Sequence, residues 1–173
     1  MTITINMLDK SKIKYNWETL YVGISVNLVE VRELTNYALK IMDDDKYEYD
    51  EFINELAWGE GDRLKCEILT KMLLKFNLNT LIPKSANWNL EIRKLRYSML
   101  NYLRSTIEDY NELLRKLEEV YADFNYPQDM EEFIEYMPSK DNLSLYSIED
   151  NKKYMINNLD KFLTLEEKEL NEK

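Results

Sequence analysis

The sequence predicts an all-α protein, an irregular multi-helix bundle with one long central helix. Three glycines and three prolines are spread over 173 residues, too few for the many tight turns of a β-sheet protein. Apolar residues recur at intervals of three and four along most of the chain, the spacing of one buried helix face. The length suits one domain and no linker divides it, so we expect a single helical domain over residues 1–173.

Capping residues and apolar spacing locate the helices of the first half of the chain. Asn16 and Asp50 are suitable N-cap residues in front of periodic apolar runs. Gly59 and Gly61 interrupt the pattern. The alternation at residues 2–5 is too short to predict a strand. The expected helices are residues 17–24, 28–42, 51–58 and a run that begins at Asp62.

The second half contains the longest helical pattern. An apolar stripe extends from Trp88 to Tyr121 without glycine or proline. We therefore expect one helix of more than 30 residues, which opens near Ser85 or Asn87 and kinks near residues 105–109.

Two shorter helical patterns follow. Pro127 suits the first turn of a short helix, and Asn125 and Gln128 have the spacing of a capping box. Ser147 opens the last helix, which we expect to fray over residues 169–173.

The residue types exclude several kinds of chemistry. Histidine is absent and Cys66 is the single cysteine, which rules out Cys/His zinc sites, histidine-containing di-iron sites and Ser-His-Asp triads. We interpret Cys66 as a small apolar core residue on a helix. No catalytic residue, cofactor site or metal site is predicted. Without a signal peptide or an apolar run near the roughly 18 residues of a membrane span, we expect a cytoplasmic protein that binds no membrane.

The net charge of −10 is concentrated in two acidic segments. Residues 43–62 carry nine acidic side chains and one basic one, and residues 118–173 carry fifteen acidic and six basic. Residues 63–117 are basic, but they contain no motif that reads DNA or RNA. Acidic surfaces repel nucleic acid, so we expect no nucleic-acid binding. The charge pattern allows two interpretations, an ordinary solvated surface or a surface for a basic protein partner.

One motif supports an enzymatic alternative. Glu131, Glu132 and Glu135 have the spacing of carboxylates on one helix face, as in the magnesium sites of all-α nucleotide pyrophosphatases. Such enzymes need a second acidic pair on the following helix. Here that helix has Glu149 and Asp150 adjacent, followed by lysines. A carboxylate-only, magnesium-dependent nucleotide pyrophosphohydrolase is therefore the alternative prediction.

The segment from Tyr121 to Pro138, with its Tyr-Ala-Asp-Phe-x-Tyr-Pro-x-Asp-Met string, is the most individual part of the chain. It resembles the hallmark of an uncharacterised bacterial family, domain of unknown function 2247, and the resemblance extends upstream through Trp17, Gly23 and Trp88. Asn125 and Gln128 stand where that family is usually acidic. Proteins of this kind are similar to immunity proteins encoded beside secreted bacterial toxins, and the resemblance implies a toxin-neutralising role.

We therefore predict a non-enzymatic immunity-type protein that binds a basic partner, a secreted bacterial toxin domain, through an acidic and aromatic surface. Reversal of the charges of Asp129, Glu131 and Glu132 together is expected to weaken the complex without unfolding the protein. The predicted partner-binding residues are Asp43, Asp44, Asp45, Asp123, Tyr126, Asp129, Glu131, Glu132, Glu135 and Tyr136.

Overall fold

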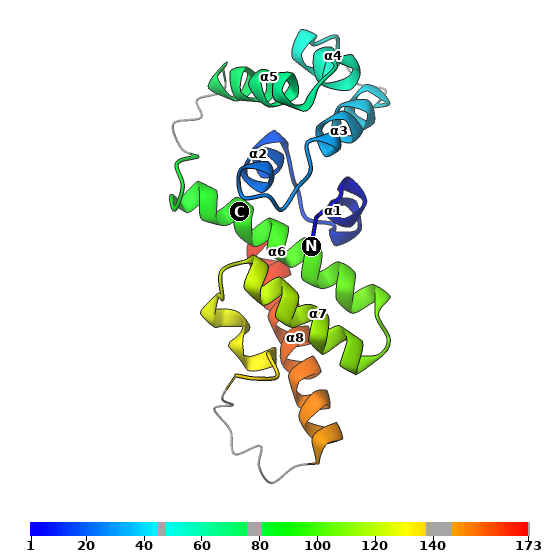
Figure 1. Cartoon of the computed structure of the whole chain (residues 1–173), viewed down its shortest axis with the longest axis vertical. Helices are drawn as coiled ribbons and strands as arrows, with labels where there is room; N and C mark the ends of the chain where they lie inside the picture. Colours follow the sequence, from blue (N-terminus) through cyan, green and yellow to red (C-terminus); the bar gives the residue numbers. More distant parts are fainter. Residues whose placement is uncertain (45–47, 76–80, 138–146, 173) are drawn as a thin grey trace. The chain divides into compact units, whose positions relative to one another are not determined.

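The computed structural model describes residues 1–44, 48–75, 81–137 and 147–172. Within these ranges every regular element is a helix, which confirms the all-α prediction (Figure 1). The chain forms two compact units. Residues 2–95 make up the N-terminal unit, and residues 96–173 together with Met1 make up the C-terminal unit. The prediction of a single domain remains a prediction.

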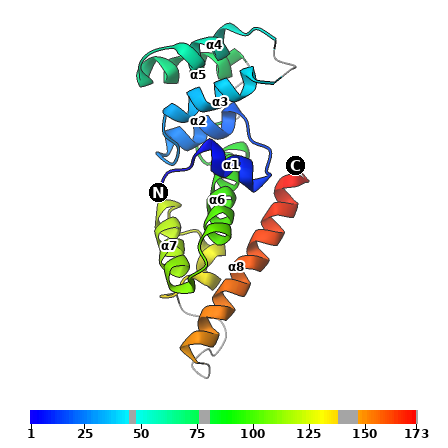
Figure 2. The same cartoon turned by 90° about the vertical axis from the view of Figure 1, so that its right-hand side faces the viewer.

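The N-terminal unit is a stack of short helices (Figure 2). Helix α3 packs against α1 and α4, and α5 packs against α2 and α4. The predicted caps are confirmed, because the side chains of Asn16 and Asp50 accept hydrogen bonds from the first-turn N–H groups of α2 and α4. The helices are α1 (Ile5–Ser11), α2 (Trp17–Ser25), α3 (Arg32–Met42), α4 (Glu51–Trp58), α5 (Asp62–Lys75) and the first half of α6 (Ala86–Thr106).

The helix expected at residues 28–42 begins only at Arg32, so the prediction was wrong for its first turn. Ile3 and Val29 form an isolated parallel β-bridge, and the N–H of Ile3 donates to the carbonyl of Leu28 at 2.7 Å. Leu28 and Val29 are buried. The segment therefore pairs with the N-terminus in an extended conformation, a tertiary contact that apolar spacing does not reveal.

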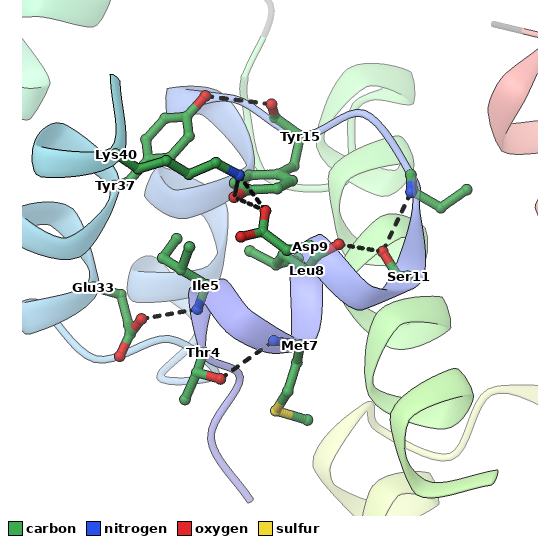
Figure 3. A network of polar contacts seen from close by, with 11 residues as sticks. Thr4, Ile5, Met7, Leu8, Asp9, Ser11, Tyr15, Glu33, Tyr37 and Lys40 are labelled. Atoms are coloured by element: carbon green, nitrogen blue, oxygen red, sulfur yellow. Dashed lines mark hydrogen bonds and ion pairs between the residues drawn. The ribbon is translucent and has the colours of Figure 1, made fainter. Parts of the chain in front are cut away.

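Helix α1 has no counterpart in the sequence-based prediction, and polar contacts join it to α3 (Figure 3). The N–H of Ile5 donates to the buried carboxylate of Glu33 at 2.8 Å. Asp9 accepts a hydrogen bond from the Tyr15 hydroxyl at 2.6 Å and forms an ion pair with Lys40. Burial, followed by the hydrogen bond to Asp9, raises the pKa of Tyr15 far above its ordinary value, so this phenol stays protonated.

The C-terminal unit consists of the second half of α6, α7 (Tyr110–Asp123), the 3-10 helix η2 (Gln128–Phe133) and α8 (Ile148–Asn171). Helix α8 packs against both η2 and α7, and η2 also packs against α7. After α6 the chain reverses direction into α7 (Figures 1 and 2). The core of this unit is formed by apolar side chains that include Leu100, Leu114, Leu117, Phe133 and Leu159.

The single long central helix was a wrong prediction, although the kink was expected at the right place. The chain breaks between α6 and α7, where Asp109 caps the new helix by accepting the N–H of Glu112 at 2.8 Å. The hydroxyls of Ser105 and Thr106 donate to the carbonyl of Tyr102 at the end of α6. The Asp109 cap satisfies a first-turn N–H group of α7, and serine and threonine hydroxyls that bond to the backbone compete with the continuation of a helix.

The boundaries of the last two helices are partly as predicted. Ser147 caps α8, which confirms the predicted start. The predicted fraying over residues 169–173 was wrong as far as Asn171, because Leu170 is 5% exposed and packs at the helix end. The short helix near Pro127 exists, but it is a 3-10 helix without a side-chain cap, so the predicted capping box was also wrong.

Gly23 is the basis of a stability prediction for the N-terminal unit. A Cβ atom at Gly23 would lie 2.4 Å from Val29 Cγ2, whereas a Cβ at Gly61 would meet no atom within 4 Å. We expect Gly23→Ala to lower the free energy of unfolding by about 2–3 kcal/mol through overpacking. Gly61→Ala should cost only the left-handed backbone penalty, about 1 kcal/mol. Urea unfolding followed by circular dichroism measures both, and an equal or smaller loss for Gly23→Ala would contradict the expected clash.

Candidate partner-binding surface

Three tyrosine rings are grouped in the C-terminal unit. Tyr121, in the last turn of α7, is buried, and its ring contacts those of Tyr126 and Tyr136 at centroid distances of 5.2 Å and 6.3 Å. Tyr126 and Tyr136 are 61% and 58% exposed. The buried ring thus supports two exposed ones.

The end of α7 explains how Tyr126 reaches Tyr121. The N–H of Tyr126 donates to the carbonyl of Tyr121 at 2.8 Å, and the N–H of Asn125 donates to the carbonyl of Ala122 at 3.0 Å. This is the Schellman pattern, in which Asn is a favoured left-handed residue and a contact between the flanking apolar side chains is common. Asn125 and Tyr126 have φ angles of 60° and 57°. Asn125 therefore terminates α7 and does not cap η2.

Three carboxylates surround these rings. The pKa of Glu118 is raised by burial and then by the negative charge of Glu135. The pKa of Tyr121 is raised by burial and then by the charge of Glu131. Among the residues that the structure describes, none of these three carboxylates forms an ion pair. We call this set the tyrosine–glutamate surface; it comprises Glu118, Tyr121, Tyr126, Glu131, Glu135 and Tyr136.

Asp129, another predicted partner residue, has an internal role. Its carboxylate binds the guanidinium of Arg96 through two hydrogen bonds of 2.8 Å and 2.6 Å. Arg96 is 7% exposed, lies 3.7 Å from Glu166 and stacks over the Phe162 ring at 5.3 Å. A buried cation needs such partners, so reversing the charge of Asp129 would disturb the fold as well as any interface.

The remaining predicted residues lie elsewhere. Asp123 forms a 2.6 Å ion pair with the α-amino group of Met1. Glu132 is exposed, and its backbone carbonyl accepts a hydrogen bond from Asn158. Asp43 and Asp44 are exposed at the end of α3 in the N-terminal unit, and Asp45 lies outside the described residues. Of the ten predicted residues, the tyrosine–glutamate surface therefore brings together Tyr126, Glu131, Glu135 and Tyr136.

Glu118 and Tyr121 are members of the surface that sequence reasoning missed. Both lie on α7, and Tyr121 was interpreted as the end of an apolar stripe and the start of the family-like segment, not as a partner-binding residue. Their separation by three residues places them on one helix face. This spacing, next to the acidic and aromatic segment 123–136, is the signal that could have identified them.

The carboxylates of the enzymatic alternative do not share a helix face. Glu131 and Glu132 lie on η2, but η2 ends at Phe133 and Glu135 lies beyond it. Across the parts of the chain that the structure describes, no group of three Asp, Glu, His or Cys residues is placed to hold a metal ion. Asp150, on the following helix, is engaged by Ser147 at the start of α8.

Two other expectations concern the rest of the chain. Cys66 lies on α5 but is only partly buried, which corrects its interpretation as a core residue. Burial and then the charge of Asp62 raise the pKa of its thiol, which disfavours the reactive thiolate.

No helix in the described ranges combines the length and apolar character that a membrane crossing requires.

Comparison with known proteins identifies a family and gives no activity. The model of a family described as "Uncharacterized protein conserved in bacteria (DUF2247)" matches residues 5–167 of the chain. No curated protein and no solved structure matches. The family match covers all of the residues of the tyrosine–glutamate surface.

The role of Asp129 can be tested through stability. Asp129→Asn leaves the buried Arg96 without its main counter-charge, and we expect it to lower the free energy of unfolding by about 2 kcal/mol. Asp160→Asn is the control, because Asp160 binds Arg104 in the same two-bonded manner but at a more exposed site. It should cost less than about 1 kcal/mol. Equal losses in urea unfolding would show that burial of Arg96 is not what makes Asp129 important.

Glu118 and Glu119 are expected to have opposite effects on stability. The raised pKa of Glu118 means that its contribution to stability is present at low pH and is lost as the pH rises past the ordinary value of 4.5. The pKa of Glu119 is lowered, first by a hydrogen bond from Lys116, so its contribution is present at neutral pH and is lost in acid.

Glu118→Gln should therefore raise the Tm at pH 7, and Glu119→Gln should lower it, with both differences shrinking toward pH 4. Thermal unfolding at the two pH values measures this. A fall in Tm at pH 7 for Glu118→Gln would contradict the charge crowding at this surface.

Proposed function

Because the chain belongs to this uncharacterised bacterial family, we propose its function from the chemistry of its own surface. The protein binds a basic protein partner through the tyrosine–glutamate surface and neutralises it, as an immunity protein neutralises a secreted toxin. The observation that carries the proposal is that Glu118, Glu131 and Glu135 lie near exposed tyrosine rings and form no ion pair among the described residues.

Like charges held close together destabilise one another, and the charge of Glu135 adds to burial, the larger cause, in raising the pKa of Glu118. A cation placed between them removes this repulsion, so the carboxylates interact more favourably with a basic partner than with water alone. Arginine and lysine also stack on tyrosine rings, for about 0.5–2 kcal/mol each. Tyr126 and Tyr136 are exposed enough to receive them.

The distribution of charge over the two units favours the same surface. Residues 96–173 contain 10 basic and 18 acidic side chains, a net charge of −8, which leaves −2 for residues 2–95. A negative field around the C-terminal unit attracts a basic protein and accelerates encounter. A toxin that acts on nucleic acid must itself be basic near its active site, because it has to neutralise phosphates. Such a toxin domain is the partner class that we propose.

The hydrolase alternative is not proposed further. Its three glutamates do not lie on one helix face, and no observation in the described residues favours a magnesium site.

The test begins with the natural partner. The untagged protein is purified from its native host at low salt, and a protein that co-purifies in stoichiometric amount is identified by mass spectrometry. We expect this partner to be basic, to dissociate at high salt, and to inhibit bacterial growth unless the present protein is co-expressed.

Variants then locate the interface. Glu131→Lys with Glu135→Lys should weaken the complex at least tenfold, about 1.4 kcal/mol, and reduce its salt dependence. Glu108→Lys with Glu167→Lys changes the net charge of the C-terminal unit equally at exposed sites outside the surface. Asp129 is left unchanged because it neutralises Arg96. Equal affinities for the two double variants, or an acidic partner, would refute the proposed interface.

A further inference from the structure

A groove of about 370 Å³ lies in the C-terminal unit between η2 with its following residues and the start of α8. Its apolar lining comes from Ile134, Met137, Ile148 and Met155. Ile134 and Met155 belong to the buried core, whereas Ile148, at the first position of α8, is 75% exposed. An isoleucine this exposed beside an apolar groove gains stabilisation only when another molecule covers it.

The polar lining of the groove is acidic. Glu131, Glu132 and Glu135 line it, and Lys152 is the one cation among its described lining residues. The ammonium of Lys152 is engaged by the side-chain oxygen of Asn111. Two of these carboxylates, Glu131 and Glu135, also belong to the tyrosine–glutamate surface, so the groove adjoins the proposed interface.

Asn151 adds an unused hydrogen-bond acceptor. It lines the groove, and its Oδ1 atom is buried without a hydrogen-bond donor within reach in the described part of the chain. Buried acceptors of this kind are uncommon, because an unmade hydrogen bond carries the full cost of desolvation. Because this atom is buried, an N–H group of a bound molecule reaches it only if the Asn151 side chain turns toward the groove.

We propose that this groove seats an amphipathic basic segment of the partner protein, a proposal that rests on the proposed function for the identity of that partner. One or two apolar side chains of the segment cover Ile148 and Met137, and its arginines or lysines face the three glutamates. The volume is at the lower end of the range for ligand sites, which suits a few side chains of a helix or turn. The acidic rim disfavours nucleic acid and anionic lipid as occupants.

A designed peptide tests the groove independently of the natural partner. The probe is a fluorescein-labelled helical peptide of leucine and arginine with leucines at positions i, i+3, i+4 and i+7. A second peptide has the same composition in an order without an apolar face. Fluorescence anisotropy should show the amphipathic peptide binding at least tenfold more tightly than its isomer. No saturable binding, or equal binding of the two peptides, overturns the proposal.

Two substitutions on α8 test whether the peptide binds in the groove. Ile148→Ser should weaken binding of the amphipathic peptide about tenfold. Leu165→Ser, which removes a 64% exposed apolar side chain of α8 outside the groove, should change it less than twofold. Thermal unfolding verifies that both variants are folded. Should Ile148→Ser be unfolded, Ile148→Val and Ile148→Ala replace it, and the alanine should weaken binding more than the valine because it removes more apolar area. Unchanged affinity for Ile148→Ser overturns the groove as the site.

The same variants separate this proposal from the proposed function. The natural partner could fail to bind the Glu131→Lys, Glu135→Lys double variant and still bind Ile148→Ser normally. That result supports the proposed function and refutes the groove as the binding site. If Ile148→Ser weakens peptide binding but no basic protein co-purifies, the groove binds amphipathic basic segments and the proposed toxin-neutralising function is refuted. If Ile148→Ser instead converts a dimer into a monomer in sedimentation, the occupant is a second copy of this chain, which also overturns the proposal.

Discussion

The guanidinium of Arg96 is a permanent charge that is 7% exposed, and the C-terminal unit is arranged to accommodate it. Asp129 supplies two hydrogen bonds, Glu166 lies 3.7 Å away, and the ring of Phe162 covers one face. An arginine deprived of these partners would be costly in the protein interior. Since Asp129 lies on η2, this ion pair fixes η2 against α6. The residues that follow η2 include Glu135 and Tyr136, so the candidate surface depends on Arg96 although Arg96 is not part of it.

The same unit retains an arrangement that is unfavourable for its own stability. Glu118 and Glu135 repel each other, while Glu119, the neighbour of Glu118, is stabilised by Lys116 and Arg115. Among the described residues, the cations of α7 therefore pair with Glu119 and not with Glu118. Local destabilisation of this kind is typical of surfaces selected for binding. It is also consistent with the exposed Ile148, an apolar group left uncovered at the edge of the neighbouring groove.

Sequence reasoning succeeded where structure is determined locally. Asn16, Asp50 and Ser147 cap their helices as predicted, because a cap involves only its own first turn. It failed where distant residues decide the outcome. The segment at residues 28–31 pairs with Ile3, and Asp129 pairs with a residue 33 positions away. Asn125 was a local error, since Asn is suited both to capping a helix and to ending one in the left-handed conformation. The acidic and aromatic residue types were enough to predict four residues of the candidate surface. Glu118 and Tyr121 of α7 were assigned to it only from the structure.

The left-handed conformation of Tyr126 has a consequence for the lifetime of a complex. A left-handed backbone conformation costs a non-glycine residue roughly 1–2 kcal/mol of free energy. This cost arises when α7 and its terminal turn fold. The ring is then already held against Tyr121 before any partner arrives. Ordering a mobile aromatic side chain at an interface would otherwise cost about 0.5–1.5 kcal/mol during association. Because this conformational entropy is lost on folding, binding a partner does not require its loss again. Preorganisation of this kind mainly slows dissociation of the complex.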